Sequence, residues 1–386
     1  MLCANVGHSN PVVIAKVTEQ LSRVSFAGPA VVRPYIQMEL VDRLTKAVDR
    51  PDDYVAFTTS GTLGVEIAIA IARNIARVRG GKARRHVLSS NLSYHGASAY
   101  TLAIAGNGVR RPREDDAFGL GPAFQAPYPP AHTQNVAPGH VCDAGCADEV
   151  ARAIDLRGSE NVAAVILEPV NGTTGGAFVP PDGYLRRVAE ICRERGVVLI
   201  HDEVLTGLWR TGKSLASHHF PGSSPDICIL SKGLGAGYTS VSAILIAPEL
   251  AQLLKSEGAD PLPALGTMSA TPLQAATCLG VLDELRHLSV DGFDQRCIWL
   301  GNRLKSLTEF SAVRDVRGIG FLYGIELQPG LLWPFMEKVE ERGVFFYPFS
   351  YATGSGFTVA PPLNSSDSDL EYLVNAVRDS LAELNA

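Results

Sequence analysis

The chain has 386 residues, of which 46% are hydrophobic and 19% charged, and its formal net charge is -6 at pH 7. The length is enough for one large and one smaller domain, and the composition is typical of a globular protein. The acidic balance argues against a protein built around nucleic acid. No apolar run reaches the roughly 20 residues of a membrane span, and the first residues lack the pattern of a secretory signal, so neither is expected.

The predicted elements of the first part are helices over 10–24, 38–48 and 65–80 and strands over 54–61 and 85–90. Residues 106–146 are rich in Gly, Pro and Ala and predict a long loop, which in a compact domain is usually functional. This loop contains His140 and Cys142, with Cys146 at its end. A single group of this kind is a weak metal signal, so no metal is expected. The seven scattered cysteines indicate reduced thiols and a cytoplasmic protein.

From residue 162 onward, continuous apolar strands alternate with helices. The predicted strands are 162–170, 197–203, 226–233 and 242–248, and the predicted helices are 183–196 and 269–288. Strands of this kind are typical of a largely parallel sheet covered by helices on both faces, so the predicted fold class is α/β. Beyond residue 290 the pattern is a helix, a strand over 318–327, a helix, short strands and a final helix. This part predicts a separate, smaller α+β domain.

The stretch DEVLTGLWRTGKS, residues 202–214, has the spacing of a phosphate-binding P-loop. A P-loop connects a strand to a helix that begins at its lysine. Here Pro221 and Gly222 follow Lys213 too closely for such a helix. The bulky Leu-Trp-Arg after Gly207 would also prevent backbone N–H groups from converging on a phosphate. An ATP-dependent function is therefore not expected.

Two charged residues stand at the ends of neighbouring predicted strands. Asp202 closes the 197–203 strand, and Lys232 closes the 226–233 strand 30 residues further along. Ligands of open α/β sheets bind beyond the carboxyl ends of the strands, so both side chains would face one crevice. A lysine there can form a Schiff base, and an aspartate can keep a pyridinium nitrogen protonated. Either residue alone could be an ordinary surface charge, but the pair indicates a pyridoxal phosphate site.

The segment between the 54–61 strand and the next helix offers a place for the phosphate. Ser60, Gly61 and Thr62 are small, and a helix N-terminus provides N–H groups and a positive dipole end. An ordinary capped turn explains these residues about equally well. Tyr94, in the stretch SYHGAS, could stack on a cofactor ring or could be a core tyrosine.

These residues resemble the class III, fold type I, pyridoxal-phosphate-dependent aminotransferases. The block from Glu168 to Gly237 is the most specific, and DEVLTGLWRTGKS is similar to the family's D-E-V-x-T-G-F-G-R-T-G signature. The motifs are nearest to those of diaminopelargonic acid aminotransferase and omega-aminotransferases, with some likeness to glutamate-1-semialdehyde aminomutase. The matching stretches, in the family's order over roughly residues 5–363, are SGTLGVEIAIAIAR, YHGAS, EPVNGTTGG, GYLRRVAEICRERGVVLIHDEVLTGLWRTGK, PDICILSKGLGAGY and GTMSATPLQAATCLGVL.

The resemblance implies a fold type I large domain over 41–289, a small C-terminal domain over 290–386, and an N-terminal segment over 1–40 that joins the small domain or a dimer arm. Lys232 would form the Schiff base with pyridoxal 5'-phosphate and move the proton, and Asp202 would pair with the pyridinium nitrogen. The other implied cofactor contacts are Ser60, Gly61 and Thr62 at the phosphate, Val204 and Tyr94 on the two ring faces, His95, Glu168 and, from the other subunit of a homodimer, Thr267.

Two features depart from the family. Relatives carry several tens of residues before the stretch NVGH, including aromatic residues that contact the substrate, whereas four residues precede it here. The segment 343–363 usually supplies an arginine that binds the substrate carboxylate through two hydrogen bonds. Tyr347 and Thr358 stand at the candidate positions and neither is cationic, which weakens the case for glutamate and 2-oxoglutarate. Arg33 is the candidate substitute.

The leading hypothesis is an aminotransferase that moves an amino group between a small-molecule donor and a carbonyl acceptor in biosynthesis. The main alternative is a racemase, an aminomutase or an eliminating or bond-forming enzyme on the same scaffold. A third hypothesis is an inactive, binding-only relative, which the pair of Lys232 and Asp202 disfavours. The sequence does not predict the donor or the acceptor.

Overall fold

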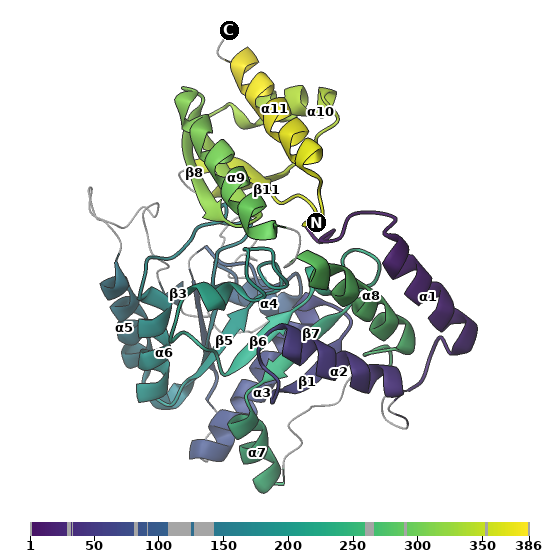
Figure 1. Ribbon diagram of the computed structural model, residues 1–386. Coiled ribbons are helices and arrows are strands. Elements are labelled where there is room, and N and C mark those ends of the chain that lie inside the picture. Colours follow the sequence, from purple (N-terminus) through teal and green to yellow (C-terminus); the bar gives the residue numbers. More distant parts are fainter. Residues whose placement is uncertain are drawn as a thin grey trace.

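The computed structural model contains two β-sheets, each with its own set of helices (Figure 1). Arg33, His140, Cys142 and most of the loop predicted over 106–146 lie outside the residues that it describes. None of the described helices is long and apolar enough to cross a bilayer. The described residues are 2–28, 32, 34–80, 84–90, 92–106, 125–126, 143–258, 266–288, 292–351 and 354–384.

The larger sheet has seven strands in the order β1-β7-β6-β5-β4-β2-β3. The strands are β1 Tyr54–Thr58, β2 His86–Ser90, β3 Gln125–Ala126, β4 Val162–Leu167, β5 Val198–Asp202, β6 Ile227–Leu230 and β7 Ser242–Ile246. β7 runs antiparallel to β1 and β6, and the other neighbouring pairs are parallel. Every residue of β4, β5, β6 and β7 is buried, as expected for strands covered on both faces. The prediction of a mostly parallel α/β sheet is confirmed.

Helices cover both faces of this sheet. α3 and α7 pack on one face through a continuous apolar layer, and the other face is covered by α5 and α6 on one side and by α2 and α8 on the other. α1 packs outside α8, where Lys16 and Arg43 both form ion pairs with Asp283. The helices are α1 Pro11–Arg23, α2 Tyr35–Ala47, α3 Gly61–Gly80, α4 Ala99–Ile104, α5 Asp148–Arg157, α6 Tyr184–Glu194, α7 Pro248–Ser256 and α8 Pro272–Leu288.

The smaller sheet is antiparallel, with the order β10-β11-β9-β8, and lies at the top of Figure 1. Its strands are β8 Val313–Ile319, β9 Leu322–Leu327, β10 Tyr347–Tyr351 and β11 Gly354–Val359, and its helices are α9 Phe293–Lys305, α10 Leu332–Glu341 and α11 Asp367–Leu384. The strand predicted over 318–327 begins too early: its residues from Leu322 onward form β9, whereas Gly318 and Ile319 end β8 and the chain turns between the two strands. Gly320 makes this turn with a φ of 64°, and β8 is a charged, half-exposed strand that apolar patterning misses.

A fully buried arginine joins the two sheets to the N-terminal segment. The guanidinium of Arg210 donates to Asn5 Oδ1 (2.7 Å), to Pro361 O (2.6 Å) and to Phe321 O (3.2 Å). Burial lowers the pKa of Arg210 to about 10, which still leaves it charged at neutral pH. Asn5 in turn accepts from Leu363 N through its carbonyl oxygen at 2.7 Å. These bonds hold the first residues of the chain beside the loop that follows β5.

β5 also contains a histidine that is completely buried. His201 lies beside Cys228 of β6 in the parallel register, and neither of its ring nitrogens has a hydrogen-bond partner among the described residues. Burial lowers the pKa of His201 from 6.5 to about 3, because a charged imidazole cannot be solvated there.

We expect His201 to make folding sensitive to acid. As the pH falls below 6.5, the unfolded chain protonates His201 while the folded chain does not, so stability is lost down to the folded pKa of about 3. One such group can change stability by up to about 1.4 kcal/mol per pH unit. The free energy of unfolding, measured with urea, should therefore fall less between about pH 7 and about pH 5 for His201→Leu than for the unaltered protein. His8→Gln, which removes an exposed imidazole, is the control, and equal acid sensitivity of His201→Leu would contradict the assignment.

Candidate active site

The carboxyl ends of β5 and β6 bring Asp202 and Lys232 to one edge of the larger sheet. Asp202 is the last residue of β5 and lies beside Ile229 of β6. Lys232 follows the end of β6 and has a φ of 23°, a region that residues other than glycine rarely adopt. Such strained backbone is concentrated at functional sites. The two side chains thus meet at the edge where ligands of α/β sheets bind.

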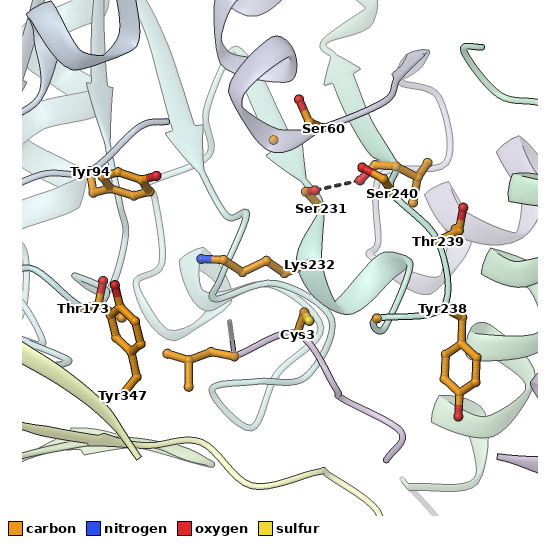
Figure 2. Close-up of a pocket in the computed structure, with 14 residues that line it drawn as sticks. Cys3, Ser60, Tyr94, Thr173, Ser231, Lys232, Tyr238, Thr239, Ser240 and Tyr347 are labelled. Carbon is orange, nitrogen blue, oxygen red and sulfur yellow. Dashed lines mark hydrogen bonds between the residues drawn. The ribbon is translucent and has the colours of Figure 1, made fainter. Parts of the chain in front are cut away.

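Lys232 extends into a cavity of about 530 Å³. Figure 2 shows its amine pointing toward the side of the cavity on which Tyr94, Thr173 and Tyr347 lie. Lys232 is the only charged side chain among the described residues that line the cavity. The lining residues come from the N-terminal segment, from the start of α3, from β10 of the smaller sheet and from loops that follow strands of the larger sheet: Leu2, Cys3, Ser60, Gly61, Tyr94, Thr173, Ser231, Lys232, Gly237, Tyr238, Thr239, Ser240, Val241 and Tyr347.

The N-terminus of α3 forms one side of this cavity. Ser60 precedes the helix, and its hydroxyl oxygen accepts from Leu63 N at 3.2 Å. A Cβ on Gly61 would lie 3.0 Å and 3.1 Å from the two methyl carbons of Val204, so a larger residue would crowd this contact. The first N–H groups of a helix lack partners within it, which suits this place to an anion such as a phosphate. Thr62, one residue further, accepts from Ala97 N at 3.3 Å.

The Asp202 carboxylate is held in a fixed orientation. His95 Nδ1 lies 2.7 Å from Asp202 Oδ2, and Val204 N donates to Asp202 Oδ1 at 3.1 Å. Asp202 and His95 are both buried, and His95 Nε2 has no hydrogen-bond partner among the described residues. A buried carboxylate oriented by an imidazole is suited to holding a proton on a ligand nitrogen.

Glu168 follows β4 and forms a second buried carboxyl beside this pair. It accepts from Gly172 N at 3.1 Å, from Asn171 Nδ2 at 3.0 Å and from Tyr94 N at 3.3 Å. Burial raises the pKa of Glu168 to about 7, against the opposing effect of His95. The carboxyl therefore connects the loop after β4 to the backbone of the cavity residue Tyr94.

Of the remaining predicted site residues, Tyr347 and Thr358 belong to the smaller sheet and Thr267 lies on the surface. Tyr347 lines the cavity, and Thr358 lies beside it in the antiparallel register of β10 and β11. Thr358 is buried, and its hydroxyl has no hydrogen-bond partner among the described residues. Thr267 is exposed in a turn and does not line the cavity in this chain. Within the described residues, no group of three or more His, Cys, Asp or Glu side chains is arranged to hold a metal ion.

The stretch with P-loop spacing does not form a phosphate cradle. Leu208 and Trp209 have φ values of 56° and 64°, and the chain after Lys213 forms only the short 3-10 turn Ala216–His219. The Lys213 amine donates to His218 O at 3.0 Å, within the same segment. The nucleotide interpretation is therefore excluded by geometry.

Several cavity residues were not singled out from the sequence. Thr173 belongs to the recognised stretch EPVNGTTGG, and Ser231 directly precedes Lys232, so motif position offered a signal for both. Leu2 and Cys3 offered no signal, because the N-terminal segment reaches the cavity through tertiary contacts, such as the hydrogen bonds of Asn5 with Arg210 and Leu208. Gly237 and Tyr238 end the recognised stretch PDICILSKGLGAGY, whereas residues 239–241 lie outside every motif.

Comparison with known proteins identifies the family. Residues 1–381 match the family model described as aminotransferase class-III. The chain belongs to the class III aminotransferases. It is 30% identical to an uncharacterised aminotransferase, YodT, of Bacillus subtilis, and the alignment covers 98% of this chain and 88% of that protein. It is 29% identical to an omega-aminotransferase of Caulobacter vibrioides, over 99% of this chain and 88% of that one.

A solved amine transaminase from an uncultivated Pseudomonas species, in a form with pyridoxal phosphate bound, superposes with a TM-score of 0.89. It is 27% identical, and the match covers 99% of this chain and 89% of that one. This class III aminotransferase is thus a pyridoxal-phosphate-dependent enzyme of the fold expected from the sequence. The donor set fits that cofactor, because an amine, an oriented buried carboxylate and a helix N-terminus meet at one edge of the sheet.

Proposed function

We propose that the protein transfers an amino group from a small amine to a small carbonyl compound, with pyridoxal phosphate attached to Lys232. The observation that carries this proposal is the position of the Lys232 amine in a cavity bounded by the N-terminus of α3 and by Tyr94. Among the described cavity residues it is the only amine. A lysine in this place can both bind a carbonyl covalently and move a proton.

The neighbouring residues would hold the cofactor as the family resemblance implies. Ser60, Gly61 and Thr62 would bind the phosphate, Asp202 would keep the ring nitrogen protonated, and Tyr94 and Val204 would enclose the two ring faces. When bound, pyridoxal phosphate supplies a carbonyl for covalent attachment and a ring that withdraws electrons from the substrate carbon. His95 orients Asp202 through its 2.7 Å hydrogen bond, and Glu168 fixes the backbone of Tyr94.

The Lys232 amine would also serve as the base for proton transfer. It would accept a proton from the substrate carbon and return one, which is the proton transfer that a transamination needs. The alternative reactions on this scaffold, such as racemisation and elimination, would use the same lysine but would not leave the amino group on the cofactor.

We also propose a homodimer in which Thr267 contacts the cofactor phosphate of the partner subunit. Thr267 is exposed, and so is its neighbour Met268. Large apolar side chains are also exposed along α1, α2 and the segment between them: Val12, Ile14, Leu21, Val24, Phe26, Val32, Tyr35 and Met38. Exposed apolar surface of this extent commonly marks a contact with another protein.

A biosynthetic role and a cytoplasmic location complete the proposal. Cys192, Cys228 and Cys278 are buried thiols without a disulfide, which is usual in a reducing compartment. Burial raises the pKa of all three thiols, so they remain in the unreactive protonated form.

The substrate itself is expected to be uncharged in the part that faces the smaller sheet. Tyr94, Thr173 and Tyr347 form a neutral wall there, and the buried Thr358 beside Tyr347 adds no charge. A carboxylate placed against this wall would lose its hydration without gaining a cationic partner from the described residues. Amines and carbonyl compounds without a second carboxylate suit this surface better than glutamate and 2-oxoglutarate do.

The first prediction of this proposal concerns Lys232. Borohydride reduction should couple the cofactor to the segment 226–238, which mass spectrometry would detect, and Lys232→Ala should abolish turnover. Asp202→Asn should retain some cofactor but slow the reaction at least about a hundredfold, since about 1.4 kcal/mol of barrier is a tenfold change. Lys213→Ala is the matched control, because Lys213 is a nearby lysine outside the cavity. A protein without any adduct on 226–238 would refute the proposal.

The dimer has its own test. Thr267→Glu would place a negative charge against the partner's phosphate, and Lys232→Ala removes the catalytic amine, so each variant should be inactive alone. Mixed dimers should regain activity, because one of their two sites then has both Lys232 and Thr267. Absence of rescue, despite subunit exchange demonstrated by mass spectrometry, would show that each site is self-contained.

The neutral wall predicts the choice of amino acceptor. In single-turnover experiments, 2-oxoglutarate should accept the amino group from the loaded cofactor at least about thirtyfold more slowly than uncharged aldehydes or ketones do, because a lost bidentate ion pair costs about 2–5 kcal/mol. Tyr347→Arg should narrow this difference, and Tyr347→Phe should not. Fast, saturable reaction with low 2-oxoglutarate would show that another cation binds it, and Arg33→Gln would then test the first candidate.

A further inference from the structure

One face of the smaller sheet packs against the loop that follows Glu168, here called the 171–176 loop. Arg317, Gly324, Thr358 and Tyr347 lie in one row across β8, β9, β11 and β10, each beside the next in the antiparallel register. Residues opposite one another in such a register share a face. Tyr347 at one end of the row lines the cavity, and Arg317 at the other end contacts the loop.

Arg317 holds the loop through a single carbonyl oxygen. Its Nε and Nη2 atoms donate to Gly175 O at 3.1 Å and 2.9 Å, while Nη1 donates to Asp315 at 2.6 Å and to Glu326 at 2.8 Å. The side chain of Arg317 is only 10% exposed, and that of Glu326 is fully buried. Tyr351 donates its hydroxyl to the same Glu326 carboxylate. Asp315 and Glu326 therefore orient the planar guanidinium group, whose Nε and Nη2 donors are directed at Gly175 O.

A continuous path of hydrogen bonds leads from this carbonyl to the cavity. Gly175 N donates to Asn171 Oδ1 at 2.5 Å, and Asn171 Nδ2 donates to Glu168 Oε2 at 3.0 Å. The same carboxylate oxygen accepts from Tyr94 N at 3.3 Å. Asn171 Nδ2 also lies 2.6 Å from Leu92 O, two residues before Tyr94. Thr173, which lines the cavity, lies inside the loop that these bonds define.

Close packing leaves the loop little freedom against the sheet. A Cβ on Gly176 would lie 2.5 Å from Phe349 Cζ, and a Cβ on Gly324 would overlap the Gly176 carbonyl. Gly176 also has a φ of 62°, which favours glycine. Backbone and ring therefore touch directly at this interface, so a displaced sheet must displace the loop as well.

We propose that Arg317 is a positioning residue that fastens the 171–176 loop to the smaller sheet and thereby sets the places of Thr173 and Tyr94 in the cavity. The proposal rests on the proposed function for its catalytic consequence, but the mechanical link can be measured without any reaction. Arg317 touches neither the cavity nor the reacting atoms. Its effect passes through Gly175, Asn171 and Glu168.

Two substitutions of Arg317 distinguish a role in positioning the 171–176 loop from a role in neutralising the Glu326 carboxylate. Arg317→Gln removes both the charge and the fork, whereas Arg317→Lys keeps a cation near Glu326 but cannot reproduce the two donors directed at Gly175 O. Arg314→Gln is the matched control, because Arg314 also forms an ion pair with Glu326, at 3.0 Å, from a side chain that is 45% exposed. A purely structural role in neutralising Glu326 would be restored by Arg317→Lys and disturbed by Arg314→Gln.

The test is hydrogen–deuterium exchange of the peptide covering 168–178, measured on the full-length protein both as purified and after removal of the cofactor. We expect exchange there to become about tenfold faster or more in Arg317→Gln and in Arg317→Lys, because a charge-assisted pair of bonds is lost. The same peptide should be unchanged in Arg314→Gln. In the loaded enzyme, kcat should fall in both Arg317 variants at saturating cofactor.

Unchanged exchange in both folded Arg317 variants would overturn the proposal. So would an equal change in Arg314→Gln, or recovery of normal exchange in Arg317→Lys, since either would point to charge balance alone. If Arg317→Gln does not fold, Arg317→Lys decides the matter. If no cofactor adduct forms on Lys232 but the 168–178 peptide shows the expected hydrogen–deuterium exchange, the proposed function is wrong. The link between the smaller sheet and the 171–176 loop would then still hold.

Discussion

The parallel pairing of β5 with β6 brings Asp202 and Lys232 to the same edge of the larger sheet, and the other parts of the site are arranged around this edge. β1 points in the same direction as β6, since both run antiparallel to β7, and it therefore delivers the N-terminus of α3 to that edge as well. A carboxylate, an amine and a positive helix end meet there because strands that share a direction share an edge.

Buried polar groups then connect this edge to the rest of the chain. Removing Asp202, Glu168 and Arg210 from water is costly, so each is stabilised by hydrogen bonds to groups that are themselves fixed. Those partners come from distant segments: His95 follows β2, Gly172 follows β4 and Asn5 belongs to the N-terminal segment. The requirement to satisfy each buried charge thus also determines where three loops lie. Hydrogen bonds of buried groups thus tie both the candidate site and the junction between the sheets to distant segments of the chain.

The edge that holds Lys232 and Asp202 and the neutral wall of the cavity come from different parts of the fold. Asp202 ends β5 and Lys232 follows β6 of the larger sheet, whereas Tyr347 belongs to β10 of the smaller sheet and Thr173 to the loop after β4. A fold of this kind can therefore accept different side chains in the neutral wall while the edge of the larger sheet stays the same. Among the described residues, this wall consists of Tyr94, Thr173 and Tyr347, and Arg317 of the smaller sheet contacts the loop that contains Thr173 through Gly175 O.

The sequence by itself determined the α/β class, the parallel sheet and the pair of Lys232 and Asp202, because apolar strand patterns and strand-end residues are local signals. It could not separate β8 from β9, since the turn at Gly320 and the charged strand before it leave no apolar period. Only the tertiary structure decided that Leu2, Thr173 and Tyr347 share one cavity and that Arg317 reaches Gly175. These residues lie far apart along the chain, and their contact depends on how the two sheets pack, which periodicity and motif spacing do not encode.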